Sequence, residues 1–372
     1  MIIAGYEYRG REPFGDVYLT GLVRDKQKRK MSKSLGNSPD PIGLMEKYGA
    51  DGVRVGMLLC SPAGNDLLYD DSLPEQGRNF ANKIWNAFRL VMSWNLDETV
   101  EQPAASAAAV TWMRGTIDKT LSDIEENFVR YRISDALMQT YKLFWDDFSG
   151  WYLEIIKPAF GKPIDAKTRR ETLDIFEILM KVIHPFMPFI TEEIWQRLAD
   201  RPEGSSIMIE KMPLPGPYEA GLLTRFETTR EIVSAVRAVR KERNIPVKEP
   251  VVLCASPGAT GSEFDPVIIR MCNLSEIRVV EGKVEGAASF RIQTYEFFIP
   301  LSDGIDHEEE IRKLEEELVY QEGFLASVLN KLSNEKFVAN APAKVIEIER
   351  KKEADARARI DTIRDSLVHL QR

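Results

Sequence analysis

Apolar residues recur every three or four positions through the middle of the chain, which is the spacing of an amphipathic helix. Two clear series are Phe80, Ile84, Phe88 and Val91, and Ile175, Ile178, Leu179 and Val182. Proline-containing stretches at 101–109, 157–163 and 184–188 interrupt the pattern, because proline lacks a backbone donor and restricts the residue before it. Residues 74–199 are therefore predicted to form a bundle of roughly five helices.

The end of the chain has the most regular apolar spacing. Steps of three and four place on one face Ile311, Leu314, Leu318, Gln321, Leu325, Val328 and Leu332 and, after a break at 334–342, Ile360, Ile363, Leu367 and Leu370. Two such helices joined by a turn are predicted to fold back as an antiparallel coiled-coil hairpin. Parallel dimerisation is the weaker alternative.

Shorter runs before and after the bundle predict strands. A β-rich run at 17–23 leads through a basic segment to Asp40 and Pro41, which suit the N-cap and first turn of a helix, and a second helix is expected at 50–60. After the proline-rich linker at 213–217, we expect a helix at 222–243 and β-like runs at 251–255, 277–280 and 290–299.

The predicted fold is mainly α with α/β parts. Its divisions are an α/β remnant with a basic loop at 1–73, a helical bundle at 74–212, a small α/β module at 213–305 and a coiled-coil hairpin at 306–372. In the bundle, Trp85, Trp145, Trp151 and Trp195 take core-like positions, so burial is the default expectation for each.

Composition narrows the class of protein. The 372 residues are 44% hydrophobic and 29% charged, which is typical of a globular protein of several domains, and the net charge of −8 confines any nucleic-acid contact to local basic surfaces. The cysteines, Cys60, Cys254 and Cys272, are too few for a disulfide framework or a paired zinc site. No apolar run is long enough for a membrane span, so we expect a cytoplasmic protein without a membrane partner.

The basic loop at 30–37 reads KMSKSLGN and carries the clearest chemistry. Lys30 and Lys33 flank Ser32 closely enough to hold anionic oxygens, while Ser32 and Ser34 supply hydroxyl donors and Gly36 permits an unusual backbone conformation. The nearby Arg24, Lys26, Lys28 and Arg29 are expected to strengthen the positive field. The plain alternative is a solvated surface turn.

The wider sequence resembles the class I aminoacyl-tRNA synthetases. The loop is followed by Pro39, Asp40 and Pro41 and by EKYGAD at 46–51, as in that family. RNFANKIWN at 78–86, HPFMPFITEEIW at 184–195 and the terminal hairpin are similar to valyl-tRNA synthetases in particular. Isoleucyl and leucyl relatives share the loop and bundle and are the nearest alternative.

The resemblance implies the end of a class I Rossmann catalytic domain, an anticodon-binding bundle, a small α/β module and a tRNA-binding coiled-coil arm. It implies a ligase acting on ATP, L-valine and tRNA(Val) with Mg²⁺, without protein-bound zinc in this chain and without DNA or membrane partners. Lys30 and Lys33 would be catalytic, and the ATP-binding set would be Lys30, Met31, Ser32, Lys33 and Ser34. The candidates for tRNA binding are Lys83, Arg89, Arg237, Arg240, Lys241, Lys331, Lys336 and Lys344.

One expected motif is missing from these residues. The family's His-x-Gly-His nucleotide motif does not occur, since the three histidines are His184, His307 and His369, and we interpret His184 as a packed or capping residue. The editing domain is not found either. We therefore expect a fragment that begins at Met1 and cannot make valyl-adenylate alone. A stand-alone tRNA-binding or coiled-coil interaction protein derived from a synthetase is the alternative from another class.

Overall fold

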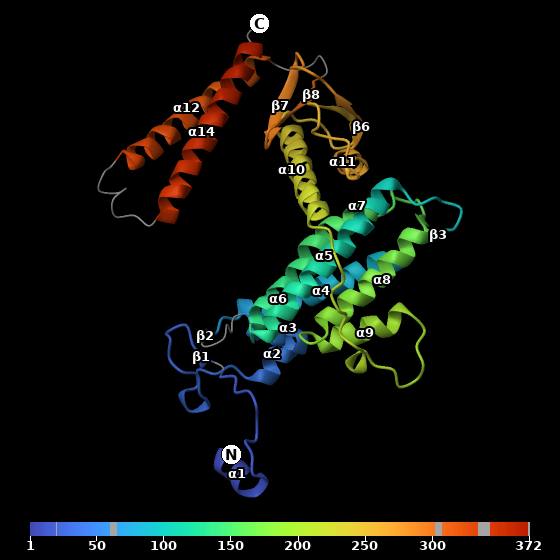
Figure 1. Ribbon diagram of the computed structural model, residues 1–372, viewed down its shortest axis with the longest axis vertical. Helices are drawn as coiled ribbons and strands as arrows, with labels where there is room; N and C mark the ends of the chain where they lie inside the picture. Colours follow the sequence, from blue (N-terminus) through green and yellow to red (C-terminus); the bar gives the residue numbers. More distant parts are fainter. Residues whose placement is uncertain (20, 60–64, 302–306, 334–342, 371–372) are drawn as a thin grey trace. The chain divides into compact units, whose positions relative to one another are not determined.

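The computed structural model describes residues 1–19, 21–59, 65–301, 307–333 and 343–370 (Figure 1). The chain divides into two compact units, Met1–Phe226 and Glu227–Arg372. Within the described residues it is mainly helical, with three small sheets. None of the described helices has the length and apolarity needed to cross a membrane. The predicted divisions at residues 73, 212 and 305 stay predictions.

The first unit is built from helices and two pairs of very short parallel strands. Strand β1 (Val23–Arg24) pairs with β2 (Leu67–Leu68), and β3 (Leu96–Asp97) pairs with β4 (Ile164–Asp165). Its helices are α1 (Ile2–Arg9), α2 (Pro41–Tyr48), α3 (Ala50–Leu59), α4 (Ser72–Met92), α5 (Ala104–Val129), α6 (Ile133–Lys142), α7 (Leu153–Ile156), α8 (Ala166–Ile183) and α9 (Pro188–Leu198), with the 3-10 turns η1 (Lys33–Leu35) and η3 (Ile207–Ile209) and the π-helix η2 (Leu143–Tyr152). Helix α10 (Ala220–Glu242) crosses into the second unit.

Aromatic packing forms the core of the helical region. Phe80 from α4, Phe144 and Phe148 from η2, and Phe176 from α8 are fully buried. The ring of Phe148 lies 5.3 Å from those of both Phe144 and Phe176, with the edge-to-face geometry that favours aromatic pairs in the second case. The predicted apolar series of α4 and α8 is therefore confirmed as the inward face of the bundle.

Two expectations about the first unit are wrong. The strand predicted at 17–23 covers only Val23–Arg24, because β2 offers just two residues for pairing and leaves Val17 and Leu19 exposed. The break predicted at 101–109 ends early, since α5 begins at Ala104 directly after Pro103. Alanine has the highest helix propensity, and five of the six residues from 104 to 109 are alanine.

In the second unit a four-stranded sheet has the order β6-β5-β8-β7. Its members are β5 (Val251–Ala255), β6 (Leu274–Val279), β7 (Ala287–Ile292) and β8 (Tyr295–Pro300), with helix α11 (Asp265–Cys272) between β5 and β6. Strands β5 and β6 are parallel, whereas β8 is antiparallel to both β5 and β7. The single run predicted at 290–299 is instead a hairpin, because Gln293 takes a positive φ of 53° and reverses the chain.

Two long helices, α12 (His307–Leu332) and α14 (Ala343–Leu370), complete the second unit and pack along each other (Figure 1). Arg359 pairs with Glu317, and Lys331 pairs with Glu349, so the numbering rises on one helix as it falls on the other. The helices are thus antiparallel, as the apolar spacing predicts. Their buried seam includes Val328, Ala356, Ile360, Ile363 and Leu367.

Candidate phosphate-binding loop and nucleic-acid interface

The lysine loop, residues 30–37, follows a tight hairpin. The N–H of Asp25 donates to the carbonyl of Arg29 at 2.9 Å, and that of Met31 donates to Val23 at 3.0 Å. Inside the loop, the Ser32 hydroxyl caps the turn η1 by accepting the Leu35 N–H at 3.3 Å. Gly36 closes the turn with φ of 64°, a conformation that favours glycine. Backbone groups and short polar side chains within the loop thus contribute to its conformation.

Ion pairing distinguishes three of the four other nearby cations from the loop lysines; Lys28 forms no ion pair among the described residues. Arg24 pairs with Asp66 at 2.5 Å, Lys26 with Asp70 at 2.8 Å, and Arg29 with Asp25 at 2.7 Å. The expectation that all neighbouring cations strengthen the positive field is therefore wrong for these three, because each is matched by a carboxylate.

Lys30 and Lys33 differ from those cations. Both are exposed, and among the described residues neither forms an ion pair. Two unmatched ammonium groups on an ordered loop can bind a ligand that carries several anionic oxygens. Ser34 is exposed beside them, while Met31 and Ser32 are half-buried and hold the loop.

Helix α3 anchors this part of the chain to the bundle. Asp51 is 7% exposed and accepts the N–H groups of Phe189 at 3.3 Å and Ile190 at 2.8 Å, at the start of α9. Burial raises the pKa of Asp51, and the two backbone donors oppose that rise. Arg54 donates to the carbonyls of Phe186 and Pro185 at 3.2 and 3.1 Å. Both ends of the corner between α8 and α9 are thus held by α3.

The exposed face of α4 carries an unusual run of amide side chains. Asn79, Asn82 and Asn86 are exposed at helical spacing. They line a groove whose other wall comes from η2 and α7 and whose lining is Asn79, Asn82, Lys83, Asn86, Ala87, Leu90, Ser149, Leu153 and Glu154. Asparagine amides both donate and accept hydrogen bonds, which suits the edges of unpaired bases. These asparagines are not among the residues predicted from the sequence to bind tRNA, although their spacing of three and four could have indicated a shared helix face.

Lys83 stands in the middle of this groove. Its ammonium lies 4.6 Å from the centroid of the Trp145 ring, and Tyr141 stacks on the same ring at 5.3 Å. Trp145 is half-buried rather than in the core, and the same holds for Trp85 and Trp151. Only Trp195 of these four is buried as expected. Phe80 also packs against the Trp145 ring, at 6.4 Å between centroids, and the attraction between the ammonium and the ring favours the position of Lys83 in the groove.

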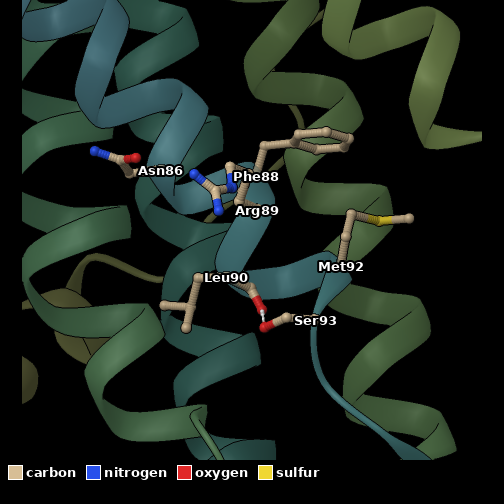
Figure 2. Close-up of a pocket in the computed structure, with 6 residues that line it drawn as sticks. All are labelled: Asn86, Phe88, Arg89, Leu90, Met92 and Ser93. Carbon is tan, nitrogen blue, oxygen red and sulfur yellow. Dashed lines mark hydrogen bonds between the residues drawn. The ribbon is translucent and has the colours of Figure 1, made fainter.

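Arg89 lies six residues after Lys83 on α4, beside a second hollow. Figure 2 shows its lining, which consists of Asn86, Phe88, Arg89, Leu90, Met92 and Ser93. The Ser93 hydroxyl donates to the Leu90 carbonyl at 2.7 Å and closes the end of the helix. Asn86 and Leu90 line both hollows, so the amides, Lys83 and Arg89 form one strip, which we call the α4 strip.

The basic candidates of α10 separate into two kinds. Arg237 and Lys241 are exposed, whereas Arg240 is 4% exposed. The Arg240 guanidinium donates to four carbonyls, those of Pro246, Glu249, Cys272 and Asn273, at 2.9 to 3.1 Å. Arg240 therefore holds the second unit together, and we withdraw it from the candidates for tRNA binding.

The candidates on the helix pair are only partly described. Lys331 is exposed and lies 3.8 Å from Glu349, whose pKa is lowered chiefly by Lys352. Lys336 lies outside the described residues, and Lys344 is described only as part of the α14 backbone. No three His, Cys, Asp or Glu side chains gather into a possible metal site within the described part of the chain.

His184 has the structural role expected of it. Its Nδ1 lies 2.7 Å from the Thr191 hydroxyl at the corner between α8 and α9. Burial lowers the pKa of His184, although Glu192 and Asp51 favour its charged form.

Three families match separate parts of the chain. The family of class I tRNA synthetases for isoleucine, leucine, methionine and valine matches residues 1–70, the anticodon-binding domain of tRNA ligase matches 111–255, and the valyl tRNA synthetase tRNA binding arm matches 306–371. The matched ranges contain the lysine loop, much of the bundle and the helix pair.

Relatives that align with the full length of this chain agree with these family matches. The valine–tRNA ligases of Parabacteroides distasonis and Porphyromonas gingivalis are 55% and 57% identical to this chain over its full length, which spans 42% of each relative. That of Chlorobaculum tepidum is 34% identical over 99% of this chain and 43% of its own. The chain belongs to the class I aminoacyl-tRNA synthetases, in the valine–tRNA ligase family, and matches the C-terminal part of those ligases.

Solved structures show a much weaker likeness. A ternary complex of the Agrobacterium radiobacter leucyl synthetase LeuRS with tRNA is 19% identical with a TM-score of 0.42, covering 69% of this chain and 28% of that one. Mycobacterium tuberculosis methionyl-tRNA synthetase with methionyl-adenylate is 23% identical with a TM-score of 0.38, covering 53% and 42%.

Proposed function

We propose that this chain is the part of a valine–tRNA ligase that supplies the lysine loop and most of the tRNA-binding surface. The whole enzyme would join L-valine to tRNA(Val) with conversion of ATP to AMP and diphosphate. The single observation that carries the proposal is the match of the full chain to valine–tRNA ligases at up to 57% identity. The lysine loop and the α4 strip supply chemistry that fits it.

In the first step, a valine carboxylate oxygen bonds to the α-phosphorus of ATP, and the bond to the bridging oxygen of the leaving diphosphate breaks. Negative charge then grows on that diphosphate. Lys30 and Lys33 are the groups of this chain that would neutralise it, because they are exposed and unpaired among the described residues. Removal of one such donor typically lowers the rate about 100- to 1000-fold.

For the tRNA, the α4 strip would face the anticodon stem and loop. Lys83 and Arg89 would contact phosphates, while Asn79, Asn82 and Asn86 would meet base edges. Arg237 and Lys241 on α10, with Lys331, Lys336 and Lys344 on the helix pair, would hold the tRNA elsewhere. The alternative, a tRNA-binding protein without ligase activity, would use the same surfaces.

The ATP used in this reaction would be bound with Mg²⁺, and we assign no residue of this chain as a ligand of that ion. A cytoplasmic location would follow from the proposed role in protein synthesis. The chain alone would be inactive in valine activation, because its 372 residues include no His-x-Gly-His motif.

The test is ATP–pyrophosphate exchange with valine, isoleucine and leucine in turn. We expect valine-dependent exchange from the longer protein that contains this chain and none from the 372 residues alone. Preference for isoleucine or leucine would refute the valine assignment. Exchange by the chain alone would refute the proposal that it cannot activate valine by itself. No exchange by the longer protein would favour the non-catalytic alternative.

A further inference from the structure

Asp25, between β1 and the lysine loop, has donors around both carboxylate oxygens. Oδ1 accepts the backbone N–H groups of Gln27 at 3.0 Å and Arg29 at 2.9 Å. Oδ2 accepts Arg29 Nε at 2.8 Å and the Asn37 side-chain amide at 2.9 Å. Asp25 is 9% exposed, so these contacts are largely shielded from water. One carboxylate thus joins the hairpin to a residue twelve positions later.

The Asn37 amide uses its remaining groups on the lysine loop. Its Nδ2 also donates to the Lys30 carbonyl at 3.3 Å, and its Oδ1 accepts the Ser32 N–H at 2.9 Å. These two backbone groups lie on either side of Met31. A single side chain therefore closes the end of the loop onto its start.

Hydrogen-bond chemistry makes the orientation of this amide depend on Asp25. A carboxylate accepts and does not donate, so the Asn37 NH2 group must face it, which turns Oδ1 toward Ser32. We propose that Asp25 is a positioning residue of the lysine loop: it fixes the Asn37 amide, which fixes the backbone from which Lys30 and Lys33 extend. The effect on the loop stands by itself, whereas an effect on catalysis rests on the proposed function.

The charge state of Asp25 agrees with this geometry. The Asn37 amide, followed by the side chain and backbone of Arg29, lowers the pKa of Asp25 to about 2 against the opposing effect of burial. The carboxylate is therefore ionised throughout the neutral range and accepts at every position that faces it.

Asp25→Asn is the sharpest variant, because it keeps the shape of the side chain. Asparagine has one acceptor oxygen, so in either orientation its NH2 group meets donors, either those of the hairpin or that of Asn37. The matched control is Asp66→Asn. Asp66 also accepts from backbone and from an arginine, namely the Leu22 N–H and Arg24, but the structure describes no contact between Asp66 and the lysine loop.

The readout is hydrogen exchange at the Ser32 amide in this chain, measured by mass spectrometry with tryptophan fluorescence as the check of folding. We expect at least about tenfold faster exchange in Asp25→Asn and in Asn37→Ala, the size of one charge-assisted hydrogen bond. The double variant should show no further increase, since both act through one bridge. Asp66→Asn should match the wild type.

Other outcomes contradict the proposal. Faster exchange in Asn37→Ala alone would show that the amide is oriented without Asp25, and no change in either would show that the loop is held by other contacts. If Asp25→Asn unfolds the unit, Asn37→Asp decides, because it sets a second carboxylate against Asp25. This variant keeps an oxygen that can accept the Ser32 N–H and loses the NH2 group that faces Asp25, so the proposal then requires faster exchange at Ser32 than in the wild type, and the wild-type rate would overturn it.

The effect on catalysis is measured in the longer protein that contains this chain and activates valine. Asp25→Asn should lower kcat for exchange about 10- to 100-fold, as expected when a catalytic group is displaced, with KM for valine little changed. Asp66→Asn should retain the wild-type kcat. If the wild type shows no valine-dependent exchange, the proposed function fails while the result on Ser32 stands. If the wild type is active and Asp25→Asn equals it, the positioning role in the reaction is refuted.

Discussion

Helices α3 and α4 approach each other so closely that Gly77→Ala should destabilise the first unit. A Cβ at Gly77 would lie 2.2 Å from the carbonyl oxygen of Gly52 and 2.8 Å from its carbonyl carbon. Both atoms belong to backbone, so a rotamer change cannot relieve the contact. The two helices would have to separate by roughly 1 Å, which forfeits part of the dispersion attraction along the whole crossing.

The magnitude is best measured against Gly115→Ala. A Cβ at Gly115, also inside a helix, would meet only Leu223 and Leu222 side chains at 3.5 and 3.7 Å, which is ordinary contact. Both variants gain the same helix propensity of about 1 kcal/mol, which cancels in their difference. Overpacking at Gly77 then lowers the free energy of unfolding by about 1–3 kcal/mol relative to Gly115→Ala. For a unit of this size, the corresponding melting temperature falls by about 2–12 °C.

The assay is unfolding in urea or by heat, followed by tryptophan fluorescence. All six tryptophans precede Phe226, so the signal reports on the first unit alone. If Gly77→Ala proves as stable as Gly115→Ala, or more stable, the close crossing of α3 and α4 is refuted.

Three further predictions concern the loop, the α4 strip and the histidine. In the longer protein, Lys33→Ala should lower the rate of valine-dependent exchange about 100- to 1000-fold, and a loss below tenfold would refute its role at the diphosphate. Lys83→Ala should weaken tRNA binding and reduce by about 1 the slope of the logarithm of the binding constant against the logarithm of the salt concentration. Lys119→Ala, which removes the ion-pair partner of Asp123, should change neither quantity. An unchanged slope in Lys83→Ala would contradict the phosphate contact. The free energy of unfolding of the first unit should fall as the pH drops from about 7.5 to 5.5, because the lowered pKa of His184 makes the unfolded state bind its proton first. In His184→Asn this dependence should flatten, since no other histidine precedes Phe226, and an unchanged dependence would exclude His184 as its cause.

Helices and caps could be predicted from the sequence because their causes are local. The apolar spacing of α4 and α8 directly reports which face is buried, and Asp40 accepts the N–H groups of Ile42 and Gly43 as a predicted N-cap should. The strand at 17–23 failed for the opposite reason. A strand extends only as far as its partner strand does, and the residues at 17–23 give no information about the length of β2.

The site was predictable only in part. Lys30 and Lys33 stood out by residue type and spacing, but their distinction from the neighbouring cations depends on carboxylates such as Asp66, about forty residues away. Arg240 looked like the other basic residues of α10, and only the folded loops after it supply the carbonyls that bury its charge. The bond between Asp25 and Asn37 was missed because a contact across a loop leaves no periodic signal.

In our proposal this chain binds tRNA(Val), and the α4 strip meets the anticodon arm of that tRNA. A filter-binding titration of the chain with intact tRNA(Val), and with the same tRNA lacking its anticodon loop, tests this directly. We expect weaker binding of the shortened tRNA, and a smaller difference in affinity between the two tRNAs for the Arg89→Ala variant. Equal affinity of the wild-type chain for both tRNAs would contradict it.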